Sequence, residues 1–357
     1  MRQPNLSGWC AFFGLLLMIG VDLRPGSATG KEERTDGPGA LPGVRCAARA
    51  GTALEILGSG GPMHREARGS AAYLLWHRGR PAAVVDMGGD TAMALARAGV
   101  DAGEIDTLLI SHFHPDHVSG LPDFLWGEIV SNRDRPLTVV GPSGTDTFPA
   151  LETFLARQFG EQGSFPFMSG LLSGEEFELE TRTVDVAVAT PQLVAEREGL
   201  RFSALGVPHG RTPALAFRID GPNFRVVLSG DQTARLPAFS RFARNADVLV
   251  AHAMITDAAA RSPLSQVVAL PGVLGAQALE SAARHVVLGH LMGHSDDDSR
   301  QWSLSDLDDV YAGIREYYTE TITLASDGLC VPLMPASQGD SGNSILPLRR
   351  SQSAVLN

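Results

Sequence analysis

Four side chains able to bind a metal ion lie close together in the string SHFHPDH at residues 111–117. His112 and His114 stand two positions apart, so an extended loop projects both imidazoles to the same side. Asp116 and His117 follow where the chain turns, so their side chains point elsewhere. One short loop can therefore offer two imidazoles to one metal ion, and a carboxylate with an imidazole to a second. These ligand types suit zinc or another borderline transition metal, whereas the alternative is a polar surface loop with a chance histidine cluster.

Two metal ions need further ligands, and three candidates lie at the ends of strand-like segments. His209 follows FSALGVP, Asp231 lies in the string SGD, and His290 follows HVVLG. An aspartate is a natural bridge because each of its two oxygens can bind one cation. Taken singly, each residue could equally be a hydrogen-bonded loop histidine or a turn-forming aspartate. Their joint placement at strand ends favours a metal site.

These residues need a framework, and strand-like and helix-like segments alternate along most of the chain. We expect strands at residues 52–58, 71–77, 82–88, 106–114 (running into a loop), 137–142, 175–188, 202–207, 214–219, 224–229, 246–252 and 285–290. We expect helices at residues 91–99, 120–130, 145–159, 270–284 and 304–318. Both halves contain strands followed by helices, which predicts two packed sheets with helices outside. The predicted fold is α/β, an αββα four-layer sandwich.

Composition limits the class of protein. The chain has 357 residues, of which 44% are hydrophobic and 19% charged, so a globular protein with a sizeable core is expected. The formal net charge of -11 argues against nonspecific binding of nucleic acid through a basic surface. The chain has 3 cysteines, too few for a small disulfide-rich scaffold.

The N-terminal segment differs from the rest of the chain. Arg2 precedes the apolar run WCAFFGLLLMIGV, which is too short to span a bilayer, and the string GSA that follows provides small residues for a cleavage site. We therefore expect export to the periplasm or the cell exterior, with no stable membrane span after cleavage; an uncleaved anchor or a misassigned start codon is the alternative. The predicted segments are a signal peptide at 1–28, a flexible linker at 29–48, one folded domain at 49–335 and a mobile tail at 336–357.

Export bears on the cysteines. Cys10 would leave with the signal peptide, whereas Cys46 and Cys330 would remain, one just before the first strand and one just after the last. Two thiols in an oxidising compartment often pair, so we expect a disulfide. Two unrelated buried thiols are the alternative.

The sequence resembles the metallo-β-lactamase fold superfamily, whose motif is HxHxDH followed by a histidine, an aspartate and a histidine. Within it, the chain is most similar to the ribonuclease Z and arylsulfatase-like branch. The strings that carry this resemblance are LGSGGP at 57–62, HG at 209–210, AFRI at 216–219 and LSGD at 228–231. The resemblance covers roughly residues 52–332, and it is specific for the fold but not for a substrate.

The resemblance implies how the ligands are shared between two ions. The first ion would be held by His112, His114 and His209, the second by Asp116, His117 and His290, with Asp231 as the bridge. The ions implied are two zinc ions, or else manganese or iron. A water or hydroxide between them would be the nucleophile, and Asp116 would also orient it.

The chain departs from the family pattern at Val268, where ribonuclease Z-like enzymes usually carry a further histidine. A proton donor for the leaving oxygen is therefore missing or supplied from elsewhere, and His252 and His294 are the candidates. Either could instead be an ordinary histidine near the ligands or on the surface. Asp86 resembles a family position that supports the metal loop, although a capping aspartate would fit equally well. No functional role is assigned to His64, His77 and His285.

Together these features predict an exported dinuclear-metal hydrolase that cleaves a small ester, either a phosphodiester, a sulfate ester or a lactone. A β-lactam is a weaker candidate, because lactamases of this fold lack the bridging aspartate that Asp231 supplies. Members that process transfer RNA carry a long inserted arm that the sequence lacks, and with the negative charge and export we expect no nucleic-acid partner. The alternative is a non-catalytic or redox metal-binding member of the fold. The oligomeric state stays open.

Overall fold

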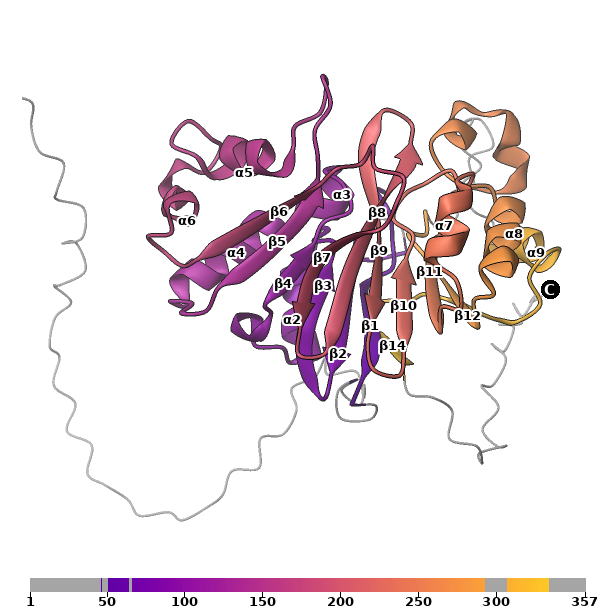
Figure 1. The fold of residues 1–357 in the computed structure, drawn as a ribbon, viewed down its shortest axis with the longest axis horizontal. Coiled ribbons are helices and arrows are strands. Elements are labelled where there is room, and N and C mark those ends of the chain that lie inside the picture. The colour runs from indigo at the N-terminus through magenta and orange to yellow at the C-terminus, as the bar shows by residue number, and fades with distance from the viewer. Residues whose placement is uncertain (1–45, 47–50, 64–65, 293–306, 334–357) are drawn as a thin grey trace, which may run out of the picture. The chain divides into compact units, whose positions relative to one another are not determined.

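The computed structural model describes residue 46 and residues 51–63, 66–292 and 307–333. Within these residues, two 7-stranded sheets lie face to face with helices on their outer sides (Figure 1). This arrangement confirms the predicted αββα sandwich. The predicted signal peptide and mobile tail lie outside the described residues, as does the predicted linker apart from Cys46.

The first sheet is mixed. Its strands, in spatial order, are β14 (Leu329–Pro332), β1 (Ala53–Gly58), β2 (Ala72–His77), β3 (Arg80–Val85), β4 (Thr107–Leu109), β5 (Leu137–Pro142) and β6 (Leu179–Val184). The strands from β14 to β3 pair antiparallel, and those from β3 to β6 pair parallel. Parallel strands end at the same edge of a sheet, so the loop after β4 opens at that edge.

The second sheet has the same mixed character. Its strands, in spatial order, are β13 (Thr321–Leu324), β12 (His285–Gly289), β11 (Val248–His252), β10 (Arg225–Leu228), β9 (Thr212–Asp220), β8 (Leu200–His209) and β7 (Gln192–Arg197). Strands β10 to β13 are parallel, and β7 to β10 are antiparallel. The carboxyl ends of β10, β11 and β12 therefore meet at one edge.

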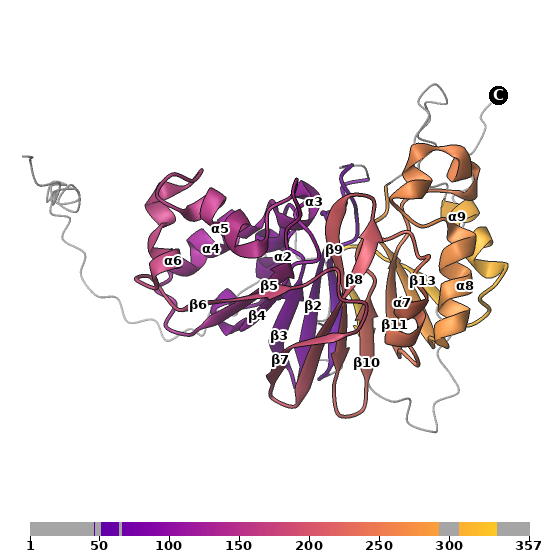
Figure 2. The same ribbon diagram turned by 45° about the horizontal axis from the view of Figure 1, so that its top comes forward.

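Helices cover the outer face of each sheet (Figure 2). On the first sheet they are α2 (Thr91–Ala98), α4 (Leu121–Val130), α5 (Leu151–Phe159) and the short α6 (Gly170–Ser173). On the second they are α7 (Pro237–Phe242), α8 (Pro271–Ser281) and α9 (Leu307–Arg315). One further short helix, α3 (Pro115–Val118), begins inside the HxHxDH string. No described helix has the length and apolar character needed to cross a membrane.

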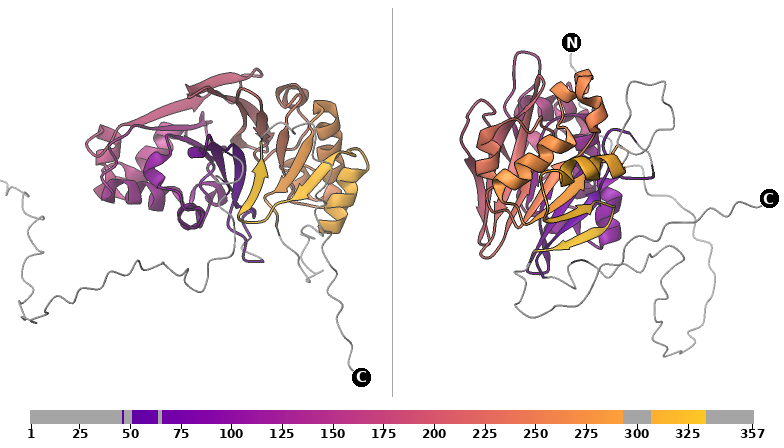
Figure 3. Two further views of the ribbon diagram at one scale, coloured as in Figure 1. Left: turned by 90° about the horizontal axis from the view of Figure 1, so that it is seen from below. Right: turned by 90° about the vertical axis from the view of Figure 1, so that its right-hand side faces the viewer.

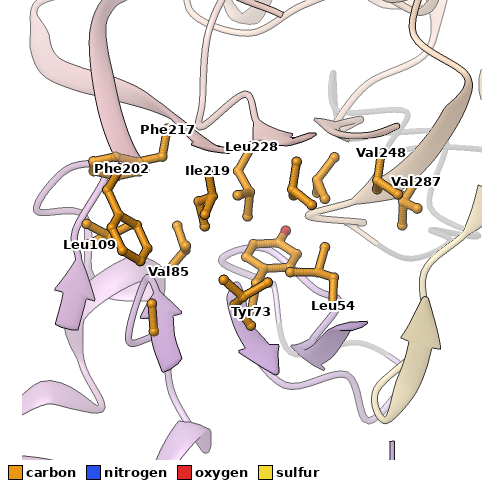
Figure 4. Close-up of a cluster of buried hydrophobic side chains, with 14 of the residues drawn as sticks. Leu54, Tyr73, Val85, Leu109, Phe202, Phe217, Ile219, Leu228, Val248 and Val287 are labelled. Carbon is orange, nitrogen blue, oxygen red and sulfur yellow. The ribbon is translucent and has the colours of Figure 1, made fainter. Parts of the chain in front are cut away.

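The central core lies between the two sheets (Figure 4). Leu54 and Ile56 of β1 point into it, whereas Ala53 and Leu57 of the same strand pack under the helices of the first sheet. Because β1 is buried on both faces, its sequence is an almost continuous apolar run rather than an alternation. Tyr73 of β2 is fully buried in the central core.

Some element boundaries differ from the prediction. The helix expected at 145–159 begins only at Leu151, because Pro149 disfavours a helical backbone at the preceding residue. The strand expected at 175–188 is limited to β6. Three strands were not predicted, namely β7, β13 and β14. Strand β7 is an edge strand with no fully buried residue, so it lacks a strong hydrophobic pattern.

The predicted disulfide is confirmed. Cys46 and Cys330 are joined, with their Cα atoms 5.5 Å apart, a normal separation for a disulfide. Cys330 lies within β14 rather than after the last strand, because β14 itself was not predicted. Strand β14 pairs with β1, so the two ends of the folded domain lie side by side (Figure 3). The disulfide therefore fastens the segment before β1 to the last strand of the sheet.

Candidate metal centre

The residues predicted to bind metal meet where strands of both sheets end. The HxHxDH string follows β4 and runs into α3, and His209 is the last residue of β8. Asp231 and His290 follow β10 and β12 within a few residues. The central core of apolar side chains lies between the sheets that carry these loops, so it fixes their relative positions.

The first cluster contains His112, His114, His209 and Asp231, whose ligand atoms all lie within 4.8 Å of one another. The Nδ1 of His114 lies 3.0 Å from the Nε2 of His112 and 3.4 Å from the Nε2 of His209. These are the three imidazoles that the sequence assigned to one ion.

The second cluster contains Asp116, His117 and His290, and all three are buried. The Nε2 atoms of His117 and His290 are 3.0 Å apart, and Asp116 Oδ2 lies 3.0 Å from His290 Nε2. Asp116 Oδ2 also lies 3.6 Å from His117 Nε2. This is the set assigned to the second ion.

Asp231 lies between the two clusters, and its Oδ2 approaches histidines of both. Its Oδ2 lies 3.9 Å from His112 Nε2 and 3.7 Å from His209 Nε2. In the second cluster, Oδ2 lies 3.7 Å from His117 Nε2 and Oδ1 lies 3.5 Å from His290 Nε2. The turn that carries it needs Gly230, which has a φ of 56° and where a Cβ would collide with the carbonyl oxygen of the neighbouring strand. A carboxylate in this position has the geometry of a bridge.

The outer nitrogens of three histidines are engaged, which fixes their inner nitrogens as potential ligands. His117 Nδ1 donates to Asp86 Oδ2 at 2.8 Å, and His209 Nδ1 donates to the carbonyl oxygen of Val267 at 2.7 Å. His112 Nδ1 lies 3.1 Å from Ser111 Oγ. Such outer partners select the tautomer that a metal-binding histidine requires.

The donor set therefore fits metal ions. Three nitrogens converge in the first cluster, and in each facing pair at most one nitrogen can point a proton at the other. Burial, followed by the nearby charge on His117, lowers the pKa of His112 well below its usual value, and burial also lowers the pKa of His114. Neutral imidazoles facing one another in a buried site are what a cation needs as ligands.

In the second cluster, electrostatics favour positive charge. Burial opposes protonation of His117, but Asp86 and Asp231 outweigh it and raise the pKa of His117 well above its usual value. Burial also opposes protonation of His290, whose pKa is nevertheless raised by Asp231 and by the hydrogen bond to Asp116. Asp116 has a pKa lowered to about 2, because its contacts with His290 and His117 outweigh its burial. The carboxylates thus stay ionised, and metal cations can replace the protons on the two imidazoles.

Two residues of the centre have a left-handed backbone conformation, which residues other than glycine rarely adopt. Asp86 has a φ of 59° and His290 a φ of 57°. Such conformations cost energy and concentrate at functional sites. Asp86 accepts hydrogen bonds from the backbone nitrogen and the Oγ of Ser111, at 2.7 Å and 2.9 Å. It therefore supports the metal loop, the role expected from the resemblance.

His252, the last residue of β11, occupies a different place from the one expected of a proton donor. Its Nδ1 lies 2.7 Å from Asp231 Oδ1, and its Nε2 lies 2.9 Å from the hydroxyl of Tyr73. His252, Asp231 and His290 also form a third group at ligand spacing. Burial and the charges of Asp86 and Asp231 raise the pKa of the Tyr73 phenol, so it stays protonated. Tyr73 was not predicted, because nothing in its strand distinguishes it from a core aromatic residue.

The remaining histidines lie apart from the centre or outside the described residues. His285 begins β12, at the far end of the strand from His290, and His77 ends β2 beside Phe224. His294 and His64 lie outside the described residues. Val268 is buried in an apolar cluster with Met254, Ile255, Ala259 and Met292.

Comparisons with known proteins identify the family. Residues 65–238 match the model of the metallo-beta-lactamase superfamily. Ribonuclease Z from Mycolicibacterium gilvum is 31% identical over 202 residues, which are 55% of this chain and 67% of that protein. Ribonuclease Z from Mycobacterium bovis is 28% identical over 219 residues, which are 60% of this chain and 74% of that protein. The chain belongs to the metallo-β-lactamase superfamily and is a metal-dependent hydrolase of that fold, as the sequence predicted.

Solved structures show the same fold. The short form of human tRNase Z has a TM-score of 0.59 and 21% identity, covering 79% of this chain and 100% of that chain. YhfI from Bacillus subtilis, a metallo-beta-lactamase fold protein, has a TM-score of 0.59 and 18% identity, covering 78% of this chain and 98% of that chain. Zn(2+)-bound PqqB from Methylobacterium extorquens has a TM-score of 0.51 and 12% identity, covering 79% and 100%.

The comparisons correct one expectation. We expected no nucleic-acid partner, partly from the net charge of -11, and that expectation was wrong. The relatives are named as ribonucleases, and the human structure as a tRNase. The physical error was to apply a charge summed over the whole chain to one site. A phosphodiester meets the local potential of the metal centre, which whole-chain charge does not set.

Proposed function

We propose that the protein is an exported phosphodiesterase with two metal ions, zinc in the first instance. The observation that carries this proposal is the position of Asp231, whose carboxylate oxygens lie within 3.9 Å of histidine nitrogens from both clusters. The similarity to ribonuclease Z supports a phosphodiester as the bond that is cleaved. Two bound ions would lower the pKa of water toward neutrality and stabilise the negative charge that develops on the phosphate oxygens.

The chain's own residues divide the remaining work. The first ion would be held by His112, His114 and His209, the second by Asp116, His117 and His290, with Asp231 shared. Asp116 is ionised, and its carboxylate can also accept a hydrogen bond from the attacking water and orient it. The supporting contacts of Asp86 and Val267 keep two of the imidazoles in the required tautomer.

Protonation of the leaving oxygen distinguishes this chain from the family pattern. Val268 offers no proton, and both ring nitrogens of His252 are engaged within the protein. His294 keeps its proposed role as an alternative donor. We therefore favour substrates with a good leaving group, such as an aryl phosphodiester, because a phenolate departs without a proton.

Export rests on the oxidised cysteine pair. Cys46 and Cys330 form a disulfide, and disulfides persist chiefly in oxidising compartments. This supports a periplasmic or secreted location, together with the apolar N-terminal run.

The test is a substrate panel on protein whose metal content has been measured. The panel contains an aryl phosphodiester, an aryl sulfate, a lactone, a chromogenic β-lactam and a 3′-extended transfer RNA. We expect the protein to hydrolyse the phosphodiester. A chelator should abolish this activity and added zinc should restore it, whereas the Asp231→Ala variant should be inactive. Cleavage of the RNA would place nucleic acid among the phosphodiesters cleaved, as the similarity to ribonuclease Z suggests. Protein that carries two metal ions but cleaves neither phosphodiester nor RNA would overturn the proposal, and activity confined to the sulfate or the lactone would reassign it.

A further inference from the structure

A buried chain of hydrogen bonds runs from the first sheet to the carboxylate between the two clusters. Tyr73 stands on β2 of the first sheet with its hydroxyl toward the second sheet (Figure 4). That hydroxyl lies 2.9 Å from His252 Nε2, and His252 Nδ1 lies 2.7 Å from Asp231 Oδ1. All three side chains are buried, at 0%, 4% and 2% exposure. Water therefore does not compete for these contacts.

The directions of the two hydrogen bonds follow from the chemistry of the partners. An ionised carboxylate only accepts, so His252 Nδ1 must donate to Asp231. In a neutral imidazole the other nitrogen then accepts, and the Tyr73 hydroxyl must donate to His252 Nε2. His252 thus has no free proton to give to a leaving group, and no free lone pair for a metal ion.

The surrounding backbone holds this arrangement. A Cβ at Gly289 would come 2.7 Å from the Tyr73 hydroxyl oxygen, so only glycine leaves room for it. The backbone nitrogen of His252 donates to Ser229 Oγ at 3.2 Å, two residues before Asp231. The loop that carries the aspartate is therefore tied to His252 through both the backbone and the side chain.

We propose that Tyr73 and His252 are positioning residues that fix the rotation of Asp231, so that Oδ1 faces His290 of the second cluster and Oδ2 lies between the two clusters. Oδ1, which accepts from His252, is the oxygen that faces His290. Oδ2, which His252 does not contact, faces His112 and His209 of the first cluster and also lies 3.7 Å from His117 Nε2 of the second. Without the donor from His252, the carboxylate can turn about its terminal bond. The contact of Oδ1 with the second cluster is then lost first. This inference rests on the proposed two-metal centre and assigns His252 a role other than general acid.

Two substitutions of His252 separate the roles. His252→Asn places an amide nitrogen close to the position of the imidazole Nδ1, so it can still donate to Asp231. His252→Gln places its amide near the Nε2 position and leaves Asp231 without a donor. We expect His252→Gln and His252→Ala to weaken binding of the second zinc equivalent about tenfold or more, the usual cost of losing an outer partner, whereas His252→Asn stays within about threefold of wild type.

The role of the Tyr73 hydroxyl is tested by Tyr73→Phe, with Tyr318→Phe as the matched control. Tyr73→Phe should weaken the second equivalent by about threefold to tenfold. Tyr318→Phe removes another buried hydroxyl, which donates to the carbonyl oxygen of Ala283 at 3.0 Å, and should leave zinc binding unchanged. Zinc affinity is measured by competition with a chromophoric chelator, and the thermal midpoint of each variant shows whether it folds.

The outcomes are distinct. Wild-type protein that binds no zinc would defeat the proposed function itself. Wild type with two zinc ions, and equal zinc affinity in Tyr73→Phe, His252→Gln and wild type, would overturn the positioning role alone. Equal loss of one full zinc equivalent in His252→Asn and His252→Ala would show that His252 is a ligand instead. Retained zinc in all variants, with activity lost only on alkyl substrates, would restore the general-acid role.

Discussion

Asp86 and His117 lie 31 positions apart in the chain, yet Asp86 Oδ2 accepts a hydrogen bond of 2.8 Å from His117 Nδ1. The same carboxylate binds the backbone nitrogen and the hydroxyl of Ser111 at the start of the metal loop. A single side chain directly after β3 therefore sets both the path of that loop and the tautomer of one of its histidines.

Replacing Asp86 with asparagine should weaken the second metal site. The amide oxygen can still accept from Ser111, but the amide nitrogen then faces His117 Nδ1 and donates to it. His117 must carry its proton on Nε2, the atom that would bind metal. We expect a loss of about tenfold to a hundredfold in affinity for the second zinc ion, as measured by chelator competition.

The matched control for this change is Asp247→Asn. Asp247 also accepts from a backbone nitrogen, that of Arg225, at 2.7 Å, but it lies just before β11, at the other end of that strand from His252. The zinc affinity of the Asp247→Asn variant should match that of wild type. Equal zinc affinity in both variants would show that the Asp86 contact has no role in the centre.

The substitutions Asp231→Ala and His209→Ala should differ in how much bound zinc they remove. Asp231→Ala takes ligand oxygens from both clusters, so purified protein should retain less than one equivalent of zinc. His209→Ala removes a ligand from the first cluster only, so about one equivalent should stay bound. Metal content measured on folded, zinc-replete protein decides the matter. Two full equivalents in Asp231→Ala would contradict the bridging role.

The sequence predicted the two-sheet sandwich and the candidate ligands but missed several single elements, for physical reasons. Ligands such as His112 and His209 are rare residue types at strand ends, where a loop can aim them inward. Strand β7 was not found because an exposed edge has no buried face to mark it. Tyr73 was not found because its role depends on a contact with His252, 179 positions away, and a buried tyrosine in a strand resembles any core aromatic residue.

The stability of the metal-free protein should be greatest near pH 6.5, the usual histidine pKa. His112, His114 and His252 have a lowered pKa, caused first by burial. Below pH 6.5 they take up protons more readily in the unfolded chain, so stability falls as pH falls. For His117 and His290, Asp86, Asp231 and Asp116 outweigh burial and raise the pKa. Above pH 6.5 only the folded chain holds those two protons, so stability is lost as pH rises through the raised values.

Thermal midpoints of chelator-treated and zinc-loaded protein, recorded from about pH 5 to about pH 9, test this prediction. Bound zinc would keep His117 and His290 neutral in the folded state, so the decline on the alkaline side should disappear. If the metal-free midpoint instead rises steadily above pH 6.5, the proposed protonation of the second cluster is wrong.

The disulfide should contribute measurably to stability. It joins residues separated by 284 positions, and an entropic estimate for so long a loop is on the order of 5 kcal/mol, often less in practice. Intact mass of protein from the oxidising compartment should be two hydrogens lighter than the dithiol. Cys46→Ser, Cys330→Ser and the double variant should lose similar amounts of unfolding free energy in denaturant titrations. Free thiols in the exported wild-type protein would contradict the pairing.

Val268 should govern which leaving groups the enzyme tolerates. It follows Val267, whose carbonyl oxygen accepts from His209, so residue 268 lies one position from a contact to the first cluster. An apolar side chain there cannot protonate an alkoxide, and wild type should cleave aryl phosphodiesters far faster than alkyl ones. Val268→His should restore a donor and narrow the ratio of kcat/KM between the two by about tenfold or more, within the range of general acid catalysis. Val268→Leu, which keeps the site apolar, should leave the ratio as in wild type. An unchanged ratio in a folded, zinc-loaded Val268→His variant would contradict this role of residue 268, and His294→Ala on the alkyl substrate then tests the other candidate donor.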